Sequence, residues 1–373
     1  MDFELTEEQR ALVDLVDRIL ADHCGHERLA ELEKDARGSG IGSVHDAQAW
    51  RALAAAGAVT ALLPADGDLG IMGLALLAET AGKHTAYVPV VAAIALGALP
   101  LARFGGHEDL LADVASGGKL ATAALEEPGE PDSLITTARR SDGDTFVLDG
   151  AKSMVPYGDL ADVVLVPAAL DDAPALFVVP RSALKVTPLL ATGRQPYAEL
   201  ELDAVTVPQE ALLARGAEAL DWLRDLGTIA YAAEASGVCT EAVAMTARYT
   251  STRKQFGEPI ASFQAVAQRA ADAFISAEAL RLCMLHAAWL MDDAARGGNA
   301  STPAEASADV AIAKFHAGDA GSRVLHAAQH LHGGIGVDTD YPLHRYFVRG
   351  QQIEQTLGTA TRQLLRIGAH LAE

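Results

Sequence analysis

Two cations, an amide and an aromatic ring stand together in the segment Tyr249–Gly257, which reads YTSTRKQFG. Arg253 and Lys254 carry the charge that binds phosphate, and Phe256 offers a flat face that can pack on a planar ring. The same residues also suit the end of a helix, because cations complement its negative pole and Gly257 can stop it. Local evidence alone favours the helix end over a ligand site.

A second segment, His330–Gly336, holds three glycines within four residues. Glycines let a backbone approach a ligand closely. A Rossmann fingerprint follows a strand and opens a helix, whereas this segment follows a helical pattern. Locally, a helix stop and a ligand loop explain it equally well. His326 and His330 are four residues apart, but no HExxH acid and no third ligand accompany them, so we expect no metal site.

Other catalytic patterns find little support. Glu126 and Glu127 are adjacent, and neighbours on a strand point to opposite faces, so we interpret them as the approach to a turn. The serines lack a GxSxG elbow. The cysteines, at positions 24, 239 and 283, are far apart and form no CxxC pair. This pattern excludes a zinc ribbon and a disulfide scaffold, and it favours a reducing, cytoplasmic location.

The net charge of the chain argues against some classes of binding partner. The chain of 373 residues has 29 Lys and Arg against 50 Asp and Glu, a net charge of −21. This balance argues against nucleic acid and anionic membranes, although local arginines can still bind an anionic small molecule. The opening residues lack the basic and apolar regions of a secretory signal. The uncharged stretch before Arg103 contains Pro89, Gly97 and Pro100, so we expect buried helical pieces there instead of a membrane span.

The periodicity of apolar residues changes twice along the chain. Apolar residues at helical spacing predict helices in the first third and again after about residue 216, whereas period-2 alternation predicts strands between them. The strongest strand signal is Ala198–Asp203, where apolar and acidic residues alternate. A Gly- and Ser-rich stretch predicts a loop over 34–45. The capping-box spacing of Thr6–Gln9, followed by apolar residues at helical spacing up to Leu20, predicts the first helix. Further predicted helices cover 46–56, 71–82, 87–103, 217–250, 262–296, 303–331 and 359–372.

The fold class is therefore α+β and multi-domain. We predict an N-terminal helical domain over 1–116, a middle antiparallel β domain over 117–215, and a C-terminal helical bundle over 216–373. Bundles with helices of this length often oligomerise.

In this order, the motifs resemble the acyl-CoA dehydrogenase family along the whole chain. The resemblance rests on the α–β–α order, on RKQFG at 253–257 followed by PIASFQ at 259–264, and on HGGIG at 332–336. It implies a middle β-barrel or sandwich and a C-terminal four-helix bundle. It also implies FAD bound between subunits and removal of two hydrogens from an acyl-CoA thioester, with a carboxylate taking the α-proton.

The family's two positions for the catalytic base are both empty. The usual Glu stands in an EGT-like block before the last helix, and this block reads TLGTA at 356–360, with Leu357 at the Glu position. The alternative position, counted back from Arg253, falls on Gly227. Neither residue can accept a proton, so the resemblance implies no catalytic residue here. Glu354 and Glu234 are candidates for a displaced base. A solvated or salt-bridged side chain is the ordinary explanation for Glu354, and a polar contact within the helical bundle is that for Glu234.

The residues that resemble the flavin-ring edge are also altered. Glu126 replaces a hydroxyl donor in LEEPG, and an ionised carboxylate cannot donate a hydrogen bond. Pro156 replaces a Thr in KSMVPY and has neither hydroxyl nor N–H. In contrast, the groups that a subunit lends to its neighbour's FAD remain; these are Arg253, Gln255, Phe256, Gln264, Gly333 and Gly334.

This asymmetry resembles the non-catalytic subunit of bacterial α2β2 acyl-CoA dehydrogenases that oxidise CoA thioesters of steroid side chains. The resemblance implies a catalytic dehydrogenase subunit as partner, an acyl-CoA substrate, and a chain that is inactive alone. Two alternatives remain open. One is a homo-oligomeric binding or scaffold protein of this fold, and the other is a self-sufficient dehydrogenase with a displaced base.

Overall fold

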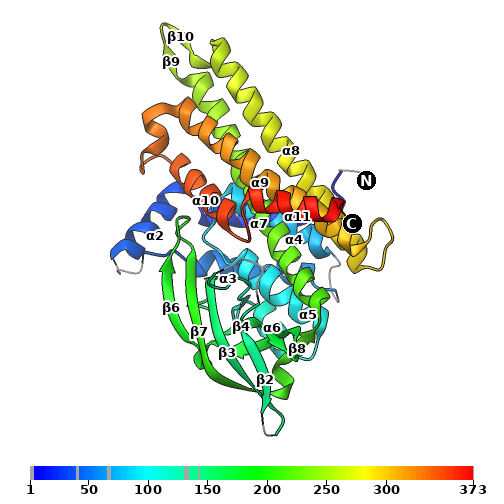
Figure 1. The fold of residues 1–373 in the computed structure, drawn as a ribbon. Helices are drawn as coiled ribbons and strands as arrows, with labels where there is room; N and C mark the ends of the chain where they lie inside the picture. Colours follow the sequence, from blue (N-terminus) through cyan, green and yellow to red (C-terminus); the bar gives the residue numbers. More distant parts are fainter. Residues whose placement is uncertain (1–3, 39–41, 65–68, 130–133, 142, 373) are drawn as a thin grey trace. The chain divides into compact units, whose positions relative to one another are not determined.

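The computed structural model describes residues 4–38, 42–64, 69–129, 134–141 and 143–372 (Figure 1). Two compact units emerge, and each combines segments that are distant in sequence. The first comprises 1–30, 71–86 and 228–373, and the second comprises 31–70 and 87–227. The three-domain division expected from the sequence stays a prediction.

The second unit is built on an eight-stranded sheet with the path β6-β7-β3-β2-β4-β5-β8, while β1 pairs with β4. Most neighbours are antiparallel, as expected, but β4 runs parallel to both β1 and β2. Along β7, Ala198, Leu200 and Leu202 are buried and the acidic residues between them are exposed, as the alternation predicts. The strands are β1 Ala121–Ala123, β2 Thr137–Ser141, β3 Thr145–Pro156, β4 Val163–Leu170, β5 Ala173–Pro180, β6 Lys185–Leu190, β7 Pro196–Pro208 and β8 Leu212–Arg215.

Helices flank this sheet in the sequence. The uncharged stretch forms buried pieces, as expected: a π-helix, η2 (Val90–Ala98), runs into α5 (Leu99–Phe104). The remaining helices of this unit are α3 (Ala47–Ala55) and α6 (Glu108–Ala115). The predicted loop over 34–45 is wrong at its start, because α2 (His26–Gly38) continues through residues 34–38. The charged run ERLAELEKDAR has helical propensity up to Gly38. Residues 39–41 of the predicted loop lie outside the described residues.

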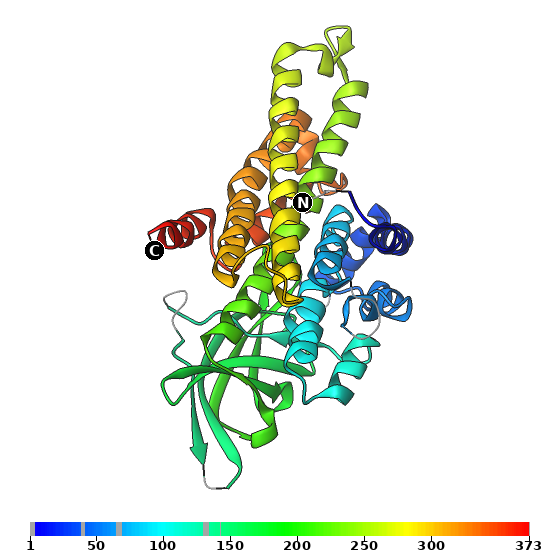
Figure 2. The same ribbon diagram turned by 90° about the vertical axis from the view of Figure 1, so that its right-hand side faces the viewer.

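The first unit is mainly helical and also contains a short two-stranded hairpin. Its α-helices are α1 (Glu7–His23), α4 (Gly70–Lys83), most of α7 (Ala217–Thr252), α8 (Gln264–Ala295), α9 (Pro303–His332), α10 (Leu343–Gln355) and α11 (Ala360–Leu371). The long helices α8 and α9 run side by side in both ribbon views (Figure 2). α1 and α9 begin with capping boxes at Thr6 and Thr302. The sequence patterns do not predict α6, which is short, or α10, which is rich in polar residues.

Two glycines let α4 and α7 touch at backbone distance. A Cβ at Gly237 would stand 1.8 Å from the carbonyl oxygen of Glu79, and one at Gly82 would stand 2.1 Å from that of Glu234. Such distances exclude any side chain, so both positions require glycine. The same contact holds the buried carboxylate of Glu79, which accepts a hydrogen bond from Ser236 Oγ at 2.7 Å and another from Arg281 Nε at 3.0 Å.

A buried ion pair ties α7 to α10. Glu234 Oε1 accepts from Arg349 Nε at 2.7 Å and also from Nη2 of the same guanidinium. Their side chains are only 7% and 5% exposed. Burying two charges is costly unless they pair closely, so removing one partner leaves an uncompensated charge.

We expect Arg349→Met to lower the free energy of unfolding by about 3–5 kcal/mol, because it strands the buried Glu234 carboxylate. The double variant Arg349→Met, Glu234→Leu removes both charges and should recover most of this loss. Urea unfolding of the purified chain measures both. Equal stability of the single variant and wild type would contradict the prediction.

Candidate functional site

The RKQFG block forms an exposed hairpin beyond the end of α7. That helix ends at Thr252, and β9 (Lys254–Gln255) pairs with β10 (Glu258–Pro259) across a two-residue turn. Phe256 and Gly257 occupy this turn with φ of 53° and 88°. Positive φ at both central residues is typical of tight hairpin turns. The expectation that Gly257 stops the helix is therefore wrong, because this glycine belongs to the hairpin.

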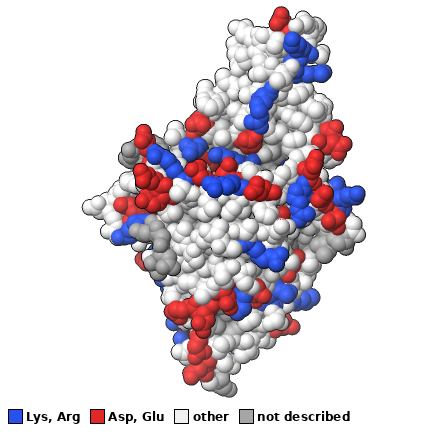
Figure 3. Space-filling model, turned by 180° about the vertical axis from the view of Figure 1, so that it is seen from behind, with Lys and Arg blue, Asp and Glu red and all other residues white. Residues whose placement is uncertain are grey.

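The hairpin presents its side chains to solvent. Phe256 is 95% exposed, with its ring edge-on to Phe263 at 6.2 Å between centroids. Arg253 and Gln255 are exposed, and so is Gln264, the first residue of α8. Figure 3 shows cationic side chains at the tip that β9 and β10 form in Figure 1. A cation, two amides and an open aromatic ring are thus available here to an external ligand or partner.

The HGGIG block ends α9 and opens into a short helical turn, η6 (Gly333–Val337). Gly333 has φ of 66°, and an added Cβ on Gly333 or Gly334 would meet nothing within 4 Å. The block is thus both a helix stop and an open backbone that a ligand can approach. The structure brings it close to the end of α7, because the rings of Tyr249 and His332 stack with centroids 4.5 Å apart.

His326 and His330, the pair spaced four residues apart, make contacts that are ordinary for histidines on a helix. His326 donates from Nδ1 to the Ser322 carbonyl at 2.8 Å and lies edge-on to Phe347. His330 is exposed. No group of three His, Cys, Asp or Glu residues in the described ranges could hold a metal ion.

The block TLGTA forms a tight turn between α10 and α11. Leu357 and Gly358 have φ of 53° and 96°. Lys314, fully buried on α9, donates from Nζ to three carbonyl oxygens, those of Ile353 at 2.9 Å, Glu354 at 3.2 Å and Gly358 at 3.0 Å. Gln363 Nε2 donates to the Leu357 carbonyl at 3.0 Å. The turn is therefore held through its backbone carbonyls by Lys314 and Gln363.

Sequence reasoning misses both Lys314 and Gln363. A lone lysine on the Ala-rich face of α9 is the available signal, since buried lysines need partners.

The displaced-base candidates can now be placed. Glu234 makes a polar contact within the helical bundle, because its carboxylate accepts a hydrogen bond from Arg349. This contact is the alternative to a role as catalytic base. Glu354 is half-buried, and its carbonyl belongs to the Lys314 contacts. Gly227 lies within α7 and carries no side chain.

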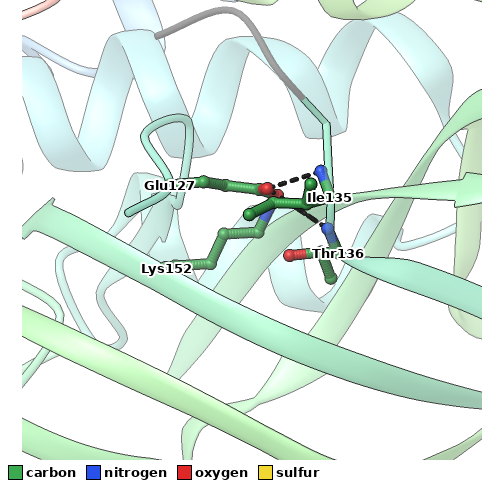
Figure 4. A network of polar contacts seen from close by, with 4 residues as sticks. All are labelled: Glu127, Ile135, Thr136 and Lys152. Carbon is green, nitrogen blue, oxygen red and sulfur yellow. Dashed lines mark hydrogen bonds and ion pairs between the residues drawn. The ribbon is translucent and has the colours of Figure 1, made fainter. Parts of the chain in front are cut away.

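The LEEPG and KSMVPY blocks meet in the sheet unit, where Glu126 bridges Ser153. Glu127 forms a buried ion pair with Lys152 and accepts from the backbone N–H groups of Ile135 at 2.6 Å and Thr136 at 3.2 Å (Figure 4). Burial lowers the pKa of Lys152 to about 8, against the opposing effect of Glu127. Burial alone raises the pKa of Glu127, but Lys152 and the N–H donors outweigh it, and the net pKa is lowered.

The end of β3 offers no hydroxyl donor at its altered position. Pro156 is the last residue of β3, and its carbonyl accepts from Thr122 Oγ1 at 2.8 Å. Between Lys152 and Val155 the pairing of β3 with β7 shifts register. The Glu127–Lys152 pair thus keeps these strand ends together, while Glu126 and Pro156 place no donor where the family resemblance expects one.

The described residues include one helix, α8, that is long and apolar enough to cross a membrane by length and composition. Of its most apolar window, 44% is buried inside the protein, and a half-buried core helix meets the same criterion. Its outer face leaves large apolar side chains exposed, with Phe274 at 55%, Ile275 at 64% and Leu282 at 43%. Exposed apolar side chains grouped on one helix are typical of a protein interface.

Comparisons with known proteins agree with these observations. The family model for the acyl-CoA dehydrogenase C-terminal domain matches residues 214–372. The acyl-CoA dehydrogenase FadE27 of Mycobacterium tuberculosis is 39% identical, over 100% of this chain and 99% of that protein. A chain of the ChsE4–ChsE5 complex from the same organism superposes with a TM-score of 0.89 at 38% identity, covering 100% and 99% of the two chains.

Two further solved structures share the fold. A chain from a variant of the Tcur3481–Tcur3483 steroid ACAD superposes with a TM-score of 0.87 at 38% identity over 98% of each chain. Butyryl-CoA dehydrogenase of Megasphaera elsdenii gives 0.84 at 26% identity over 100% of each. These similarities span both units of the chain. The chain therefore belongs to the acyl-CoA dehydrogenase family.

Proposed function

We propose that this chain is the non-catalytic subunit of a heteromeric, FAD-dependent acyl-CoA dehydrogenase that acts on the CoA thioester of a steroid side chain. The observation that carries the proposal is Leu357, an apolar side chain on a fully formed turn at the position of the family's catalytic Glu. Gly227, at the alternative position, has no side chain. The partner subunit must then supply the base, because proton abstraction needs a basic group within hydrogen-bond reach.

The residues lent to a partner's FAD fit that cofactor in chemistry. Arg253 can pair with a pyrophosphate, Gln255 and Gln264 can donate or accept hydrogen bonds, and Phe256 can pack on a ring. The open backbone at Gly333 and Gly334 admits close approach. FAD, when bound, supplies the redox chemistry, and this chain's residues hold and orient it.

The residues of this chain at the positions of the family's flavin-edge donors fit FAD poorly. A reduced flavin carries negative charge, and donors around its edge stabilise that charge. Glu126 is a carboxylate, and Pro156 offers only a carbonyl that already accepts from Thr122. We infer that the productive site uses this chain's hairpin and glycine turn together with the partner's ring edge and base.

The heteromeric arrangement is supported by the relatives and by the surface. Both chains at 38% identity come from two-component assemblies by their names, and one is described as a steroid ACAD. The exposed apolar face of α8, with Phe274, Ile275 and Leu282, offers a contact surface for a second dehydrogenase subunit.

Expressed alone, the chain should be colourless or hold FAD substoichiometrically, and it should not oxidise acyl-CoA thioesters. The reason is that each FAD site needs a ring edge and a base from the partner. Absorbance at flavin wavelengths and reduction of an artificial electron acceptor measure this. Co-expression with a catalytic family member is the control. A yellow, active homotetramer with one FAD per chain would sink the proposal.

In the complex, Arg253→Ala should weaken FAD retention by about tenfold to a hundredfold, the loss expected for one charge-assisted contact. Arg323→Ala is the matched control, because Arg323 is an exposed arginine on α9 that pairs with Asp319 within its own helix. FAD content after dialysis measures both variants. Unchanged FAD in the Arg253 variant, or equal loss in both, would argue against the proposed contact.

Leu357→Glu alone should not create an active dehydrogenase from the isolated chain. The new carboxylate restores a base but not the ring-edge donors, each worth roughly 2.7–4 kcal/mol in comparable sites. Flavin bleaching with a panel of acyl-CoA thioesters, steroid ones included, is the measurement. Clear turnover by this single variant would mean that the ring edge is intact and that only the base had been lost.

A further inference from the structure

The segment 338–342 joins the glycine turn to α10. Three histidines from different parts of the chain fasten it, which here means that they hold it by hydrogen bonds. His344 donates from Nδ1 to the Tyr341 carbonyl at 2.8 Å. The Tyr341 hydroxyl lies 3.1 Å from His332 Nε2, whose other ring nitrogen donates to the Ala328 carbonyl. The third fastening comes from the start of α2, where His26 Nε2 lies 3.0 Å from the Asp340 carbonyl.

The contacts of His26 assign its protonation state. Its Nδ1 lies 2.7 Å from Nη1 of Arg345, and a guanidinium can only donate, so Nδ1 must accept. Its Nε2 faces the Asp340 carbonyl, which can only accept, so Nε2 must donate. Both contacts are satisfied together only by the neutral ring with its proton on Nε2. A second proton would remove the acceptor and place a cation against the buried guanidinium.

We propose that His26 is a positioning residue for the Gly333–Gly334 turn, and that it fastens the 338–342 segment only while its ring is neutral. The proposal rests on the function proposed above, in which this turn contacts the partner's FAD. Proton uptake by His26 then loosens the segment, and FAD retention falls. His26 acts through Asp340 and Arg345, so no contact with FAD is assigned to it.

The charged groups near the His26 contacts are of both signs. Arg345 is the cation in contact with His26, while Glu27 and Arg28 flank it on α2. Asp338 and Asp340 stand in the segment itself, and Glu241 and Arg248 on α7 act on the neighbouring Tyr346. At the His332 fastening, burial lowers the pKa of that histidine.

The pH dependence follows from the sign of these effects. A histidine whose folded-state pKa lies below its unfolded value takes up a proton less readily when folded. The His332 contribution to stability is therefore complete above the ordinary histidine pKa of about 6.5 and is lost as the pH falls towards the folded value. The His332 contact is thus strongest at neutral pH and weakens on acidification.

Two substitutions at position 26 separate charge from structure. His26→Gln keeps a neutral donor and acceptor without titration, and His26→Lys places a permanent cation beside Arg345. In the assembled complex, we measure FAD dissociation and hydrogen exchange of the amides in 338–345 between pH 5 and 8. The exchange data are corrected for the intrinsic pH dependence of exchange. His370→Gln, at the far end of α11, is the control.

We expect wild type and the His370 control to lose FAD faster as the pH is lowered from 8 to 5. The Gln variant should show a flatter profile. The Lys variant should already release FAD at pH 7.5 between roughly twofold and tenfold faster than wild type, the range for one hydrogen bond. Wild-type acid dependence in the Gln variant, or wild-type behaviour of the Lys variant at pH 7.5, would overturn the proposal.

Failure of the proposed function has a different signature. A complex that holds no FAD at any pH would refute the assignment of the glycine turn to the cofactor. Exchange of the 338–345 amides still decides the fastening in that case, because it is measured without the cofactor. Equal exchange in wild type, Gln and Lys variants across the pH range would show that His26 does not position the segment.

Discussion

The geometry of the α10–α11 turn depends on the hydrogen bonds that the ammonium group of Lys314 donates to backbone carbonyls. This ammonium group is fully buried and reaches three carbonyl oxygens, so the desolvation of the charge is compensated only if all three stay in place. The carbonyls belong to the last turn of α10 and to Gly358, which fixes both ends of the turn. These three acceptors are backbone atoms, so the contacts of Lys314 with them do not depend on which side chain stands at position 357.

In the sheet unit, too, the residues that stabilise the fold differ from those at the positions of the flavin-edge donors. Glu127 and Lys152 bind each other in a buried pair that joins the approach to β2 with β3. Their neighbours in the two blocks, Glu126 and Pro156, are the positions that differ from the family pattern. The Glu127–Lys152 pair thus holds these segments together, while the Pro156 carbonyl accepts from Thr122. The contacts that stabilise the sheet here do not require a flavin-edge donor at position 126 or 156.

The sequence predicts most elements because their signals are local. Helical spacing places α7, α8 and α9 within a few residues, and alternation predicts which side of β7 is buried. Contacts that join distant segments leave no such signal. Neither the acceptors of Lys314 nor the link from His26 to Asp340 follows from spacing, since 314 residues separate the latter pair. The hairpin at Phe256 escapes prediction for a related reason: Gly257 suits a helix end and a turn equally, and only pairing of β9 with β10 distinguishes them.

The exposed hairpin and the altered ring edge are most informative when considered together. Leaving Phe256 almost fully in water has no benefit for this chain by itself, since burying an aromatic ring is favourable. A partner that covers the ring would convert this exposure into binding free energy. The partner would also need the cation and the open glycine backbone that lie in the same unit, because its own cofactor carries phosphates. Under the proposed function, the partner supplies the base and the flavin-edge donors, and this chain's hairpin and glycine turn complete the site.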